Sequence, residues 1–145
     1  MSGIIGGAGS KSGVIGQTEL DYEEGTWTPA HSTFTFDTTP TGSYIKIGNV
    51  VTCWGYFEFS NASTNSTAFT GLPYTGVSTS NRDGSGTTTC NIVHFWQDST
   101  FITPYVHAGS ATWNFYSTEP EGGWSSTLQS ATNSSMYFMI HYRVV

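Results

Sequence analysis

The sequence predicts an all-β protein, an antiparallel β-sandwich of the jelly-roll type that forms a small knob. Aromatic residues make up 15% of the 145 residues, and aromatic and Thr side chains favour strands. Charged residues make up only 10%, which is too few for a long solvated helix or a coiled coil. Short apolar runs recur between turns rich in Gly, Asn, Ser and Pro, as in sandwiches.

The first 19 residues differ from the rest of the chain. Residues 2–6 recur as residues 12–16, and each copy holds an aliphatic pair between glycines. Four aliphatic side chains bury too little surface to offset the entropy of ordering such a segment. We therefore expect a flexible arm. It is either a plain spacer or a docking arm, and the repeat favours docking on another protein through Ile4, Ile5, Val14 and Ile15.

An acidic stretch, residues 20–25, follows the arm and is expected to be a solvated joint. The β domain is then expected to span residues 26–145. We predict strands at 26–28, 34–36, 44–47, 50–59, 67–70, 87–96, 101–107, 111–116 and 136–145. Gly48 and Asn49 predict a tight hairpin turn, and residues 71–73 and 119–123 predict further turns.

Two of these strands are apolar on both faces. In the strand at 50–59, Val51, Cys53, Phe57 and Phe59 share one face, whereas Val50, Trp54 and Tyr56 share the other. In the last strand, one face holds Met136, Phe138, Ile140, Tyr142 and Val144, and the other holds Tyr137, Met139 and Val145. The outer face of an isolated sandwich should be polar, so these strands need a second cover. That cover is either another layer of the same chain or a neighbouring subunit, and we favour a subunit interface. The expected interface residues are Trp54, Tyr56, Tyr137, Ile140 and Tyr142.

The charge and the reactive residues exclude several classes of function. A net charge of −6 argues against nucleic-acid binding, and no apolar run is long enough to insert in a membrane as a helix. The cysteines, Cys53 and Cys90, match no zinc spacing and are expected to be buried free thiols. Carboxylates are few and no histidine pattern marks a metal site or a nucleophile. We expect no cofactor, no metal and no enzyme activity; a glycan hydrolase is the least favoured alternative.

Aromatic residues near strand ends in the second half of the chain suggest a receptor site. A flat ring can pack on a sugar face, and neighbouring neutral polar groups can bond its hydroxyls. The candidates are Trp96, Trp113, Tyr116 and Trp124, together with Arg82 at a predicted loop tip. Burial of these rings in the core is the alternative interpretation.

Three motifs in order, at residues 23–29, 42–51 and 71–74, read EEGTWTP, GSYIKIGNVV and GLPY. Together they resemble the C-terminal β-domain of tailed-phage tail-fibre and related virion structural proteins, including those of marine and cyanobacterial phages. The resemblance implies a β-sandwich, a homotrimer and a location in the virion. It carries over no catalytic residue.

About 20 residues precede this domain, whereas long fibres carry an extended shaft before it. We therefore expect a small fibre-like or spike-like knob fixed to another virion protein through the arm, where it contributes to recognition of host-surface glycans. The alternative is a capsid decoration or cement protein with no receptor.

Overall fold

The computed structural model describes residues 21–61, 68–78, 84–91, 101–119, 123–125 and 134–145. Their regular structure consists of strands, with no helix in the described residues. The strands are β1 (Tyr22–Trp27), β2 (Thr35–Phe36), β3 (Thr41–Ile47), β4 (Val50–Asn61), β5 (Gly84–Asn91), β6 (Phe101–Val106), β7 (Trp113–Glu119), β8 (Gly123–Ser125) and β9 (Ser134–Arg143).

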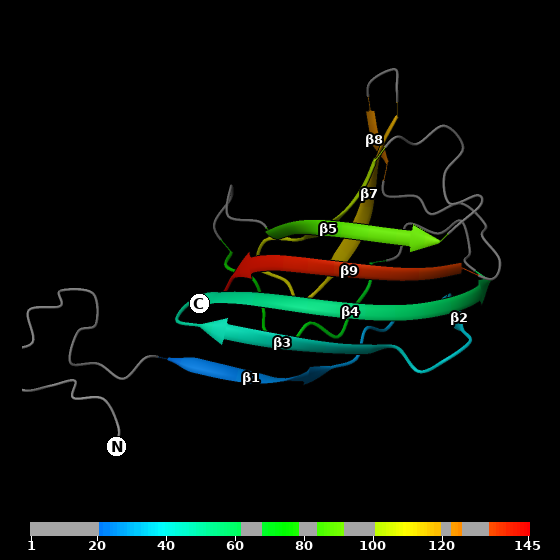
Figure 1. Cartoon of the computed structure of the whole chain (residues 1–145). Coiled ribbons are helices and arrows are strands. Elements are labelled where there is room, and N and C mark those ends of the chain that lie inside the picture. Colours follow the sequence, from blue (N-terminus) through cyan, green and yellow to red (C-terminus); the bar gives the residue numbers. More distant parts are fainter. Residues whose placement is uncertain (1–20, 62–67, 79–83, 92–100, 120–122, 126–133) are drawn as a thin grey trace, which may run out of the picture.

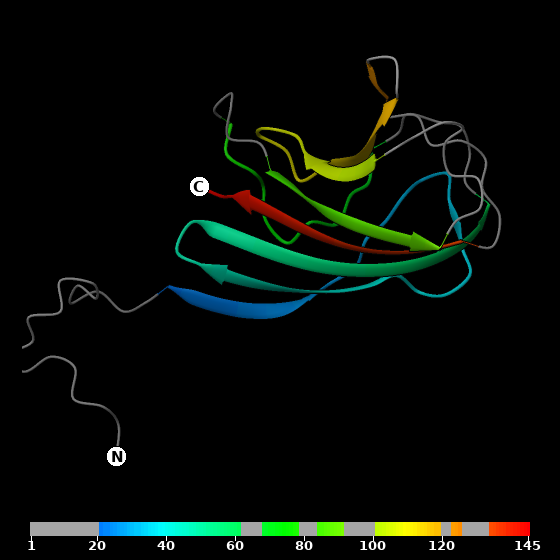
Figure 2. The same ribbon diagram turned by 45° about the horizontal axis from the view of Figure 1, so that its top comes forward.

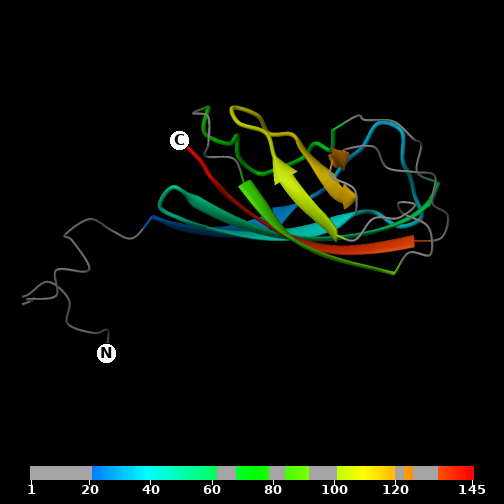
Figure 3. The same cartoon turned by 90° about the horizontal axis from the view of Figure 1, so that it is seen from above.

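All strand pairs are antiparallel, and the order in the sheet is β1-β3-β4-β9-β5-β6-β7-β8, with β2 also paired to β4. The first five of these strands lie side by side in one broad, curved layer (Figure 1). The sheet turns at β5, which pairs with β6 only through Gly84 and Ser85. As a result, β6 and β7 lie on one side of the broad layer (Figures 2 and 3). The predicted all-β, antiparallel class is confirmed.

The hairpin between β3 and β4 forms where the sequence predicted it. Ile47 pairs with Val50, which leaves Gly48 and Asn49 as a two-residue turn. Gly48 has φ of +57°, a backbone conformation that glycine adopts without the steric cost of a Cβ atom. This turn sets the register of the whole pair, so that Ser43 lies opposite Trp54 and Thr41 lies opposite Tyr56.

The core lies between the broad layer and the second layer formed by β6 and β7. Alternate residues of β4 and β9 point into it, and this division of the two faces agrees with the predicted one. The ring of Trp113 on β7 stacks on Phe69 at 4.5 Å between centroids and lies 4.8 Å from the ring of Phe138 on β9. The buried residues include Val51, Cys53, Phe57, Phe59, Phe69, Val106, Trp113, Phe115, Met136, Phe138, Ile140 and Tyr142.

Burial in this core corrects three sequence-based assignments. Ile140 and Tyr142, expected at a subunit interface, are 0% and 2% exposed. Trp113, a candidate receptor platform, is also 0% exposed. The physical reason is that β6 and β7 of the same chain cover the face of β9 that holds Ile140 and Tyr142, and that Trp113 on β7 points into the core between the two layers. Both cysteines are free as expected, but only Cys53 is buried, whereas Cys90 is exposed.

The expected acidic joint is mostly part of the sheet. Residues 22–25 belong to β1, which pairs with β3 along its whole length. Polar side chains reinforce this pairing: the Tyr44 hydroxyl donates to the Glu23 carboxylate at 2.7 Å, and Lys46 lies 2.5 Å from Asp21. The acidic residues of this stretch therefore anchor an edge strand instead of forming a linker.

Candidate functional site

The broad layer has a second face, turned away from β6 and β7, which we call the outer face. Within the described residues, four of the five large hydrophobic side chains with high exposure lie on it according to the strand register: Tyr22, Ile47, Trp54 and Tyr137. Their exposed fractions are 49%, 50%, 40% and 57%. Exposed apolar side chains that gather on one face indicate a binding surface more strongly than scattered ones do.

The register divides the outer face into two ends. At one end Tyr22, Ile47 and Val50 lie in one cross-strand row, which we call the aliphatic end. Towards the other end lie two rows that combine rings with small hydroxyl side chains. The aromatic end consists of Thr41, Ser43, Trp54, Tyr56 and Tyr137.

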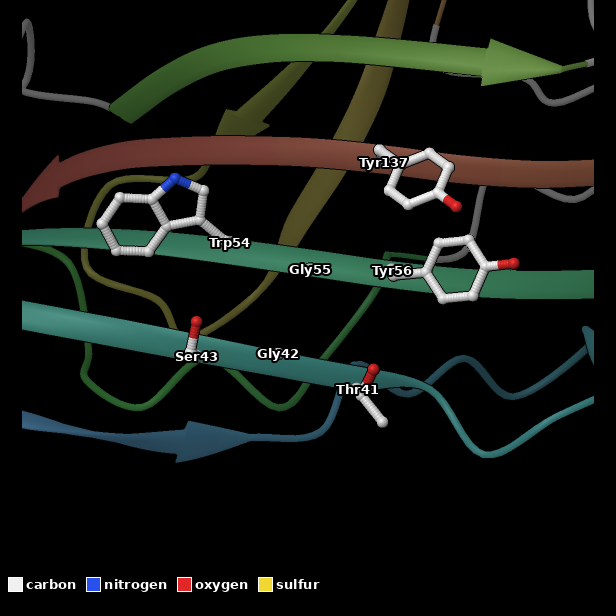
Figure 4. Close-up of a pocket in the computed structure, with 7 residues that line it drawn as sticks. All are labelled: Thr41, Gly42, Ser43, Trp54, Gly55, Tyr56 and Tyr137. Carbon is white, nitrogen blue, oxygen red and sulfur yellow. The ribbon is translucent and has the colours of Figure 1, made fainter.

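Two hollows open beside Trp54 at the aromatic end. The first has a volume of about 400 Å³ and is lined by Thr41, Gly42, Ser43, Trp54, Gly55, Tyr56 and Tyr137 (Figure 4). The second has a volume of about 440 Å³ and is lined by Glu24, Gly25, Thr26, Ser43, Tyr44, Ile45 and Trp54. Because both include Ser43 and Trp54, the two hollows are neighbours on one surface.

The hollows arise from side-chain size on adjacent strands. Ser43 and Thr41 on β3 are small, whereas their partners on β4, Trp54 and Tyr56, carry rings. The backbone between them is supported from the core side. The Trp27 Nε1–H donates to the Trp54 carbonyl at 3.0 Å, which fixes the strand directly beneath the Trp54 side chain. This wall of the hollows therefore rests on a buried, hydrogen-bonded base.

Two glycines in the lining are required by the core beneath them. A Cβ atom on Gly42 would lie 2.2 Å from Nε1 of Trp27, and one on Gly55 would lie 2.2 Å from Cζ of Phe138. Large core rings occupy the space that side chains at these positions would need. The lining of the first hollow and the packing of the core are thus linked through the same two positions.

The tyrosine rings of the aromatic end are held in a pair. The Tyr56 and Tyr137 ring centroids are 4.4 Å apart, with the planes tilted by 35°. The Tyr56 hydroxyl donates to the Glu58 carboxylate, and this hydrogen bond raises the pKa of Tyr56. Figure 4, seen from the outer side, shows the rings of Trp54, Tyr56 and Tyr137 with their faces turned towards the viewer.

Neutral groups dominate the surface around these rings. The lining of the first hollow contains no charged residue. The second includes Glu24, whose carboxylate accepts a hydrogen bond from the Tyr22 hydroxyl at 2.6 Å. Among the residues that the structure describes, no group of three His, Cys, Asp or Glu side chains is placed to hold a metal ion. The site offers ring faces and hydroxyl groups for contact.

The sequence-based site residues are only partly brought together. Trp54, Tyr56 and Tyr137 do meet on the outer face, and their contact with another subunit stays a prediction. Tyr116 lies half-buried on β7 in the second layer, with its ring 5.3 Å from that of Tyr105. The other candidates, namely Arg82, Trp96, the side chain of Trp124 on β8, Ile4, Ile5, Val14 and Ile15, lie outside the described residues.

Sequence reasoning missed the part that β3 plays in the site. Thr41 and Ser43 were not singled out, although the Gly48-Asn49 hairpin places them opposite Tyr56 and Trp54. Counting residue pairs outward from this turn along both strands would have placed Thr41 and Ser43 beside these rings.

Comparisons with protein-family models, with curated proteins and with solved structures gave no match. In the described part of the chain, no helix is long and apolar enough to cross a membrane.

Proposed function

We propose that the chain is a structural protein of a tailed-phage virion. In this proposal it is a small homotrimeric knob that has no enzymatic activity, is anchored through residues 1–19, and contributes to recognition of glycans on the host surface. The three ordered motifs at 23–29, 42–51 and 71–74 support the assignment to a virion. The placement of β6 and β7 across from β4 and β9, with the core between them, supports a jelly-roll-like sandwich.

The outer face is the observation that carries the proposal. The chain covers one face of its broad layer with its own β6 and β7, but it presents Trp54, Tyr137 and Ile47 on the other. Monomeric proteins rarely expose large contiguous apolar patches, and larger ones mark interaction sites. A protein with this surface is suited to binding, both to copies of itself and to a ligand.

The two ends of the outer face suit different partners. Tyr22, Ile47 and Val50 at the aliphatic end place three apolar side chains side by side in one cross-strand row, with the exposed Arg143 next to Val50 at its rim, and this suits contact between subunits. We place the trimer contact there. This differs from the sequence-based expectation for Trp54, Tyr56 and Tyr137, because those rings line hollows that a ligand can enter.

Labelling of intact particles tests the virion assignment. An antibody against the chain should decorate particles of the phage that encodes it, and gold-labelled images should place it at the tail. Label over the capsid surface alone would favour the decoration or cement alternative. Particles that lack the chain would overturn the proposal.

The anchoring role is tested with a protein that lacks residues 1–19. This protein should fold, as judged by circular dichroism, but fail to attach when it is added to particles assembled without the chain. A full-length variant with Ile4, Ile5, Val14 and Ile15 replaced by Ser is the matched control for length, and it should also fail. Attachment of either protein at normal occupancy would show that the arm is not the anchor.

A further inference from the structure

We propose that the two hollows beside Trp54 bind a neutral oligosaccharide. This inference deepens the host-recognition part of the proposed function, since it names the site and the chemical class of the ligand. The proposed site lies on the outer face of β3, β4 and β9, whereas the sequence pointed to aromatic residues near loops in the second half of the chain.

The rings supply the apolar part of such a site. A pyranose has one face of C–H bonds that packs against an aromatic face, and amphipathic rings are suited to sites that are half apolar and half wet. Trp54 is 40% exposed and Tyr137 is 57% exposed, so both have surface to offer. The pairing of Tyr56 with Tyr137 at 4.4 Å and the Tyr56–Glu58 hydrogen bond hold a second platform beside the first. Because these rings are held in place before binding, less side-chain conformational entropy is lost when a ligand binds.

Hydroxyl groups supply the polar part. Ser43 and Thr41 line the first hollow opposite the rings, and Ser43 and Thr26 line the second. A hydroxyl both donates and accepts, so it can match sugar hydroxyls in several orientations. A surface built from Tyr, Trp, Ser, Thr and Gly combines rigid aromatic contacts with adaptable hydrogen bonds, as the binding loops of antibodies do.

The charge selects a neutral ligand. The first hollow has no charged lining residue, and the only charged residue of the second is Glu24, an acid. The chain as a whole carries a net charge of −6, which repels anionic ligands within about a Debye length of the surface. Neither hollow offers Arg or Lys to pair with the carboxylate or sulfate of an acidic glycan.

The size and position of the hollows favour more than one sugar unit. Both hollows, of about 400 and 440 Å³, are shallow and open to solvent, so a ligand would lie along the surface across the rings. The two hollows share Trp54 and Ser43, so a chain of sugars can lie across both with the indole as the common contact.

A glycan array tests the inference with the full-length protein. The labelled chain is applied to immobilised neutral oligosaccharides and to sialylated and sulfated ones. We expect binding to members of the neutral set and none to the acidic set. The strongest neutral oligosaccharide is then titrated by calorimetry, and Trp54→Ala should weaken its binding at least tenfold. Thr87→Ala is the control: it shortens an exposed side chain on the same face but outside the lining of both hollows, and it should change affinity by less than about twofold.

A second variant fills the hollows instead of removing a ring. Ser43→Tyr places a residue with high strand propensity at an exposed strand position, so the fold should be retained. Its side chain occupies space in both hollows and should abolish binding.

Three results would overturn the inference: no neutral glycan bound, binding only to acidic glycans, or equal binding by Trp54→Ala and the unchanged chain. Loss of self-association on light scattering in Trp54→Ala, without any glycan binding, would show instead that these rings are a subunit contact. The labelling of particles does not depend on glycan binding. If no glycan binds, that experiment still decides whether the chain belongs to a virion.

Discussion

Tyr142, a buried residue near the end of β9, holds residues 68–78 against the core through its hydroxyl. Its buried hydroxyl donates to the Tyr74 carbonyl at 3.2 Å and accepts from the Tyr74 N–H at 3.3 Å. Gly76 also pairs with Val144 close by, so this hydroxyl supports a short contact between residues 68–78 and the end of β9. One side-chain atom thus satisfies two backbone groups at a place where the sheet offers no regular partner.

Tyr142→Phe should therefore destabilise the protein by about 1–2 kcal/mol, because both backbone groups of Tyr74 lose their partner. The measurement is the urea midpoint, with the slope of the transition unchanged. Tyr22→Phe is the control, since its hydroxyl bonds Glu24 at the exposed surface, and its midpoint should barely move. A shift in Tyr142→Phe no larger than in the control would show that this hydroxyl is not structural.

Glu23 gives the stability of the edge strand a dependence on pH. Hydrogen bonds from the Tyr74 and Tyr44 hydroxyls hold the pKa of Glu23 below its ordinary value of 4.5. A carboxyl with a lowered pKa in the folded state stabilises the fold above its ordinary pKa. That contribution is lost as the pH falls through the folded-state pKa.

Glu23→Gln should consequently be less stable than the unchanged chain at pH 7, and the difference should shrink as the pH falls through the lowered pKa of Glu23 in the folded state. Urea midpoints at several pH values give this comparison. Tyr44→Phe removes one of the two hydroxyl donors, so it should shift the carboxyl titration of Glu23 upward in carbon-detected NMR. Parallel stability curves for Glu23→Gln and the unchanged chain would contradict this account.

At the scale of the strands, the pair β3–β4 depends on glycines that face large core rings. Gly55→Ala would bring a Cβ atom to 2.2 Å from the Phe138 ring, which has the rings of Trp113 and Phe115 as neighbours and little freedom to move. Overpacking of this kind costs about 1–3 kcal/mol. We expect a lower urea midpoint together with chemical-shift changes in Trp54 and Tyr56.

Gly76→Ala is the matched control for this substitution. Gly76 is buried, and the nearest atoms to a Cβ there lie at 3.5 Å, an ordinary contact distance. Its free energy of unfolding should stay within about 0.5 kcal/mol of that of the unchanged chain. Equal losses in the two variants would mean that the space above Phe138 is not the cause.

The strands show which part of the fold a sequence can specify. The β3–β4 pair was predictable because its turn is local: Gly48 and Asn49 fix every pair outward from Ile47 and Val50. The alternation of β9 was equally clear. Its pairing with β4 and β5 was not, because those contacts join residues far apart in the chain, and no local pattern sets their register.

The same limit explains the errors at the candidate site. Trp54, Tyr56 and Tyr137 were grouped correctly, since alternation places them on one face of their strands. Ile140 and Trp113 were misassigned, because only the turn of the sheet at β5 brings β6 and β7 over that face. Local patterns thus identify a face of a strand, whereas the cover over that face depends on the path of the whole chain.

At the scale of the whole molecule, the two faces of the broad layer differ in how they are covered. The inner face is complete within one chain, so a single subunit has a full core. The outer face has no such cover among the described strands, and its aliphatic end keeps Tyr22 and Ile47 about half exposed. Folding of the subunit and assembly of the proposed trimer should therefore be separable steps, and a substitution at the aliphatic end should affect only the second.

Ile47→Asp tests this separation. The side chain is 50% exposed, so the charge stays hydrated in the monomer, but it would be desolvated and repelled by its copies between subunits. Light scattering should give three times 15.7 kDa for the unchanged chain and the mass of one chain for Ile47→Asp, with identical circular dichroism. Thr87→Asp is the control, because it adds the same charge to an exposed position on β5, at the far side of the outer face, and should remain trimeric. A monomeric unchanged chain would refute the trimer itself. A trimeric Ile47→Asp would show that the subunits meet elsewhere, and the first surface to examine would then be the one around Trp54.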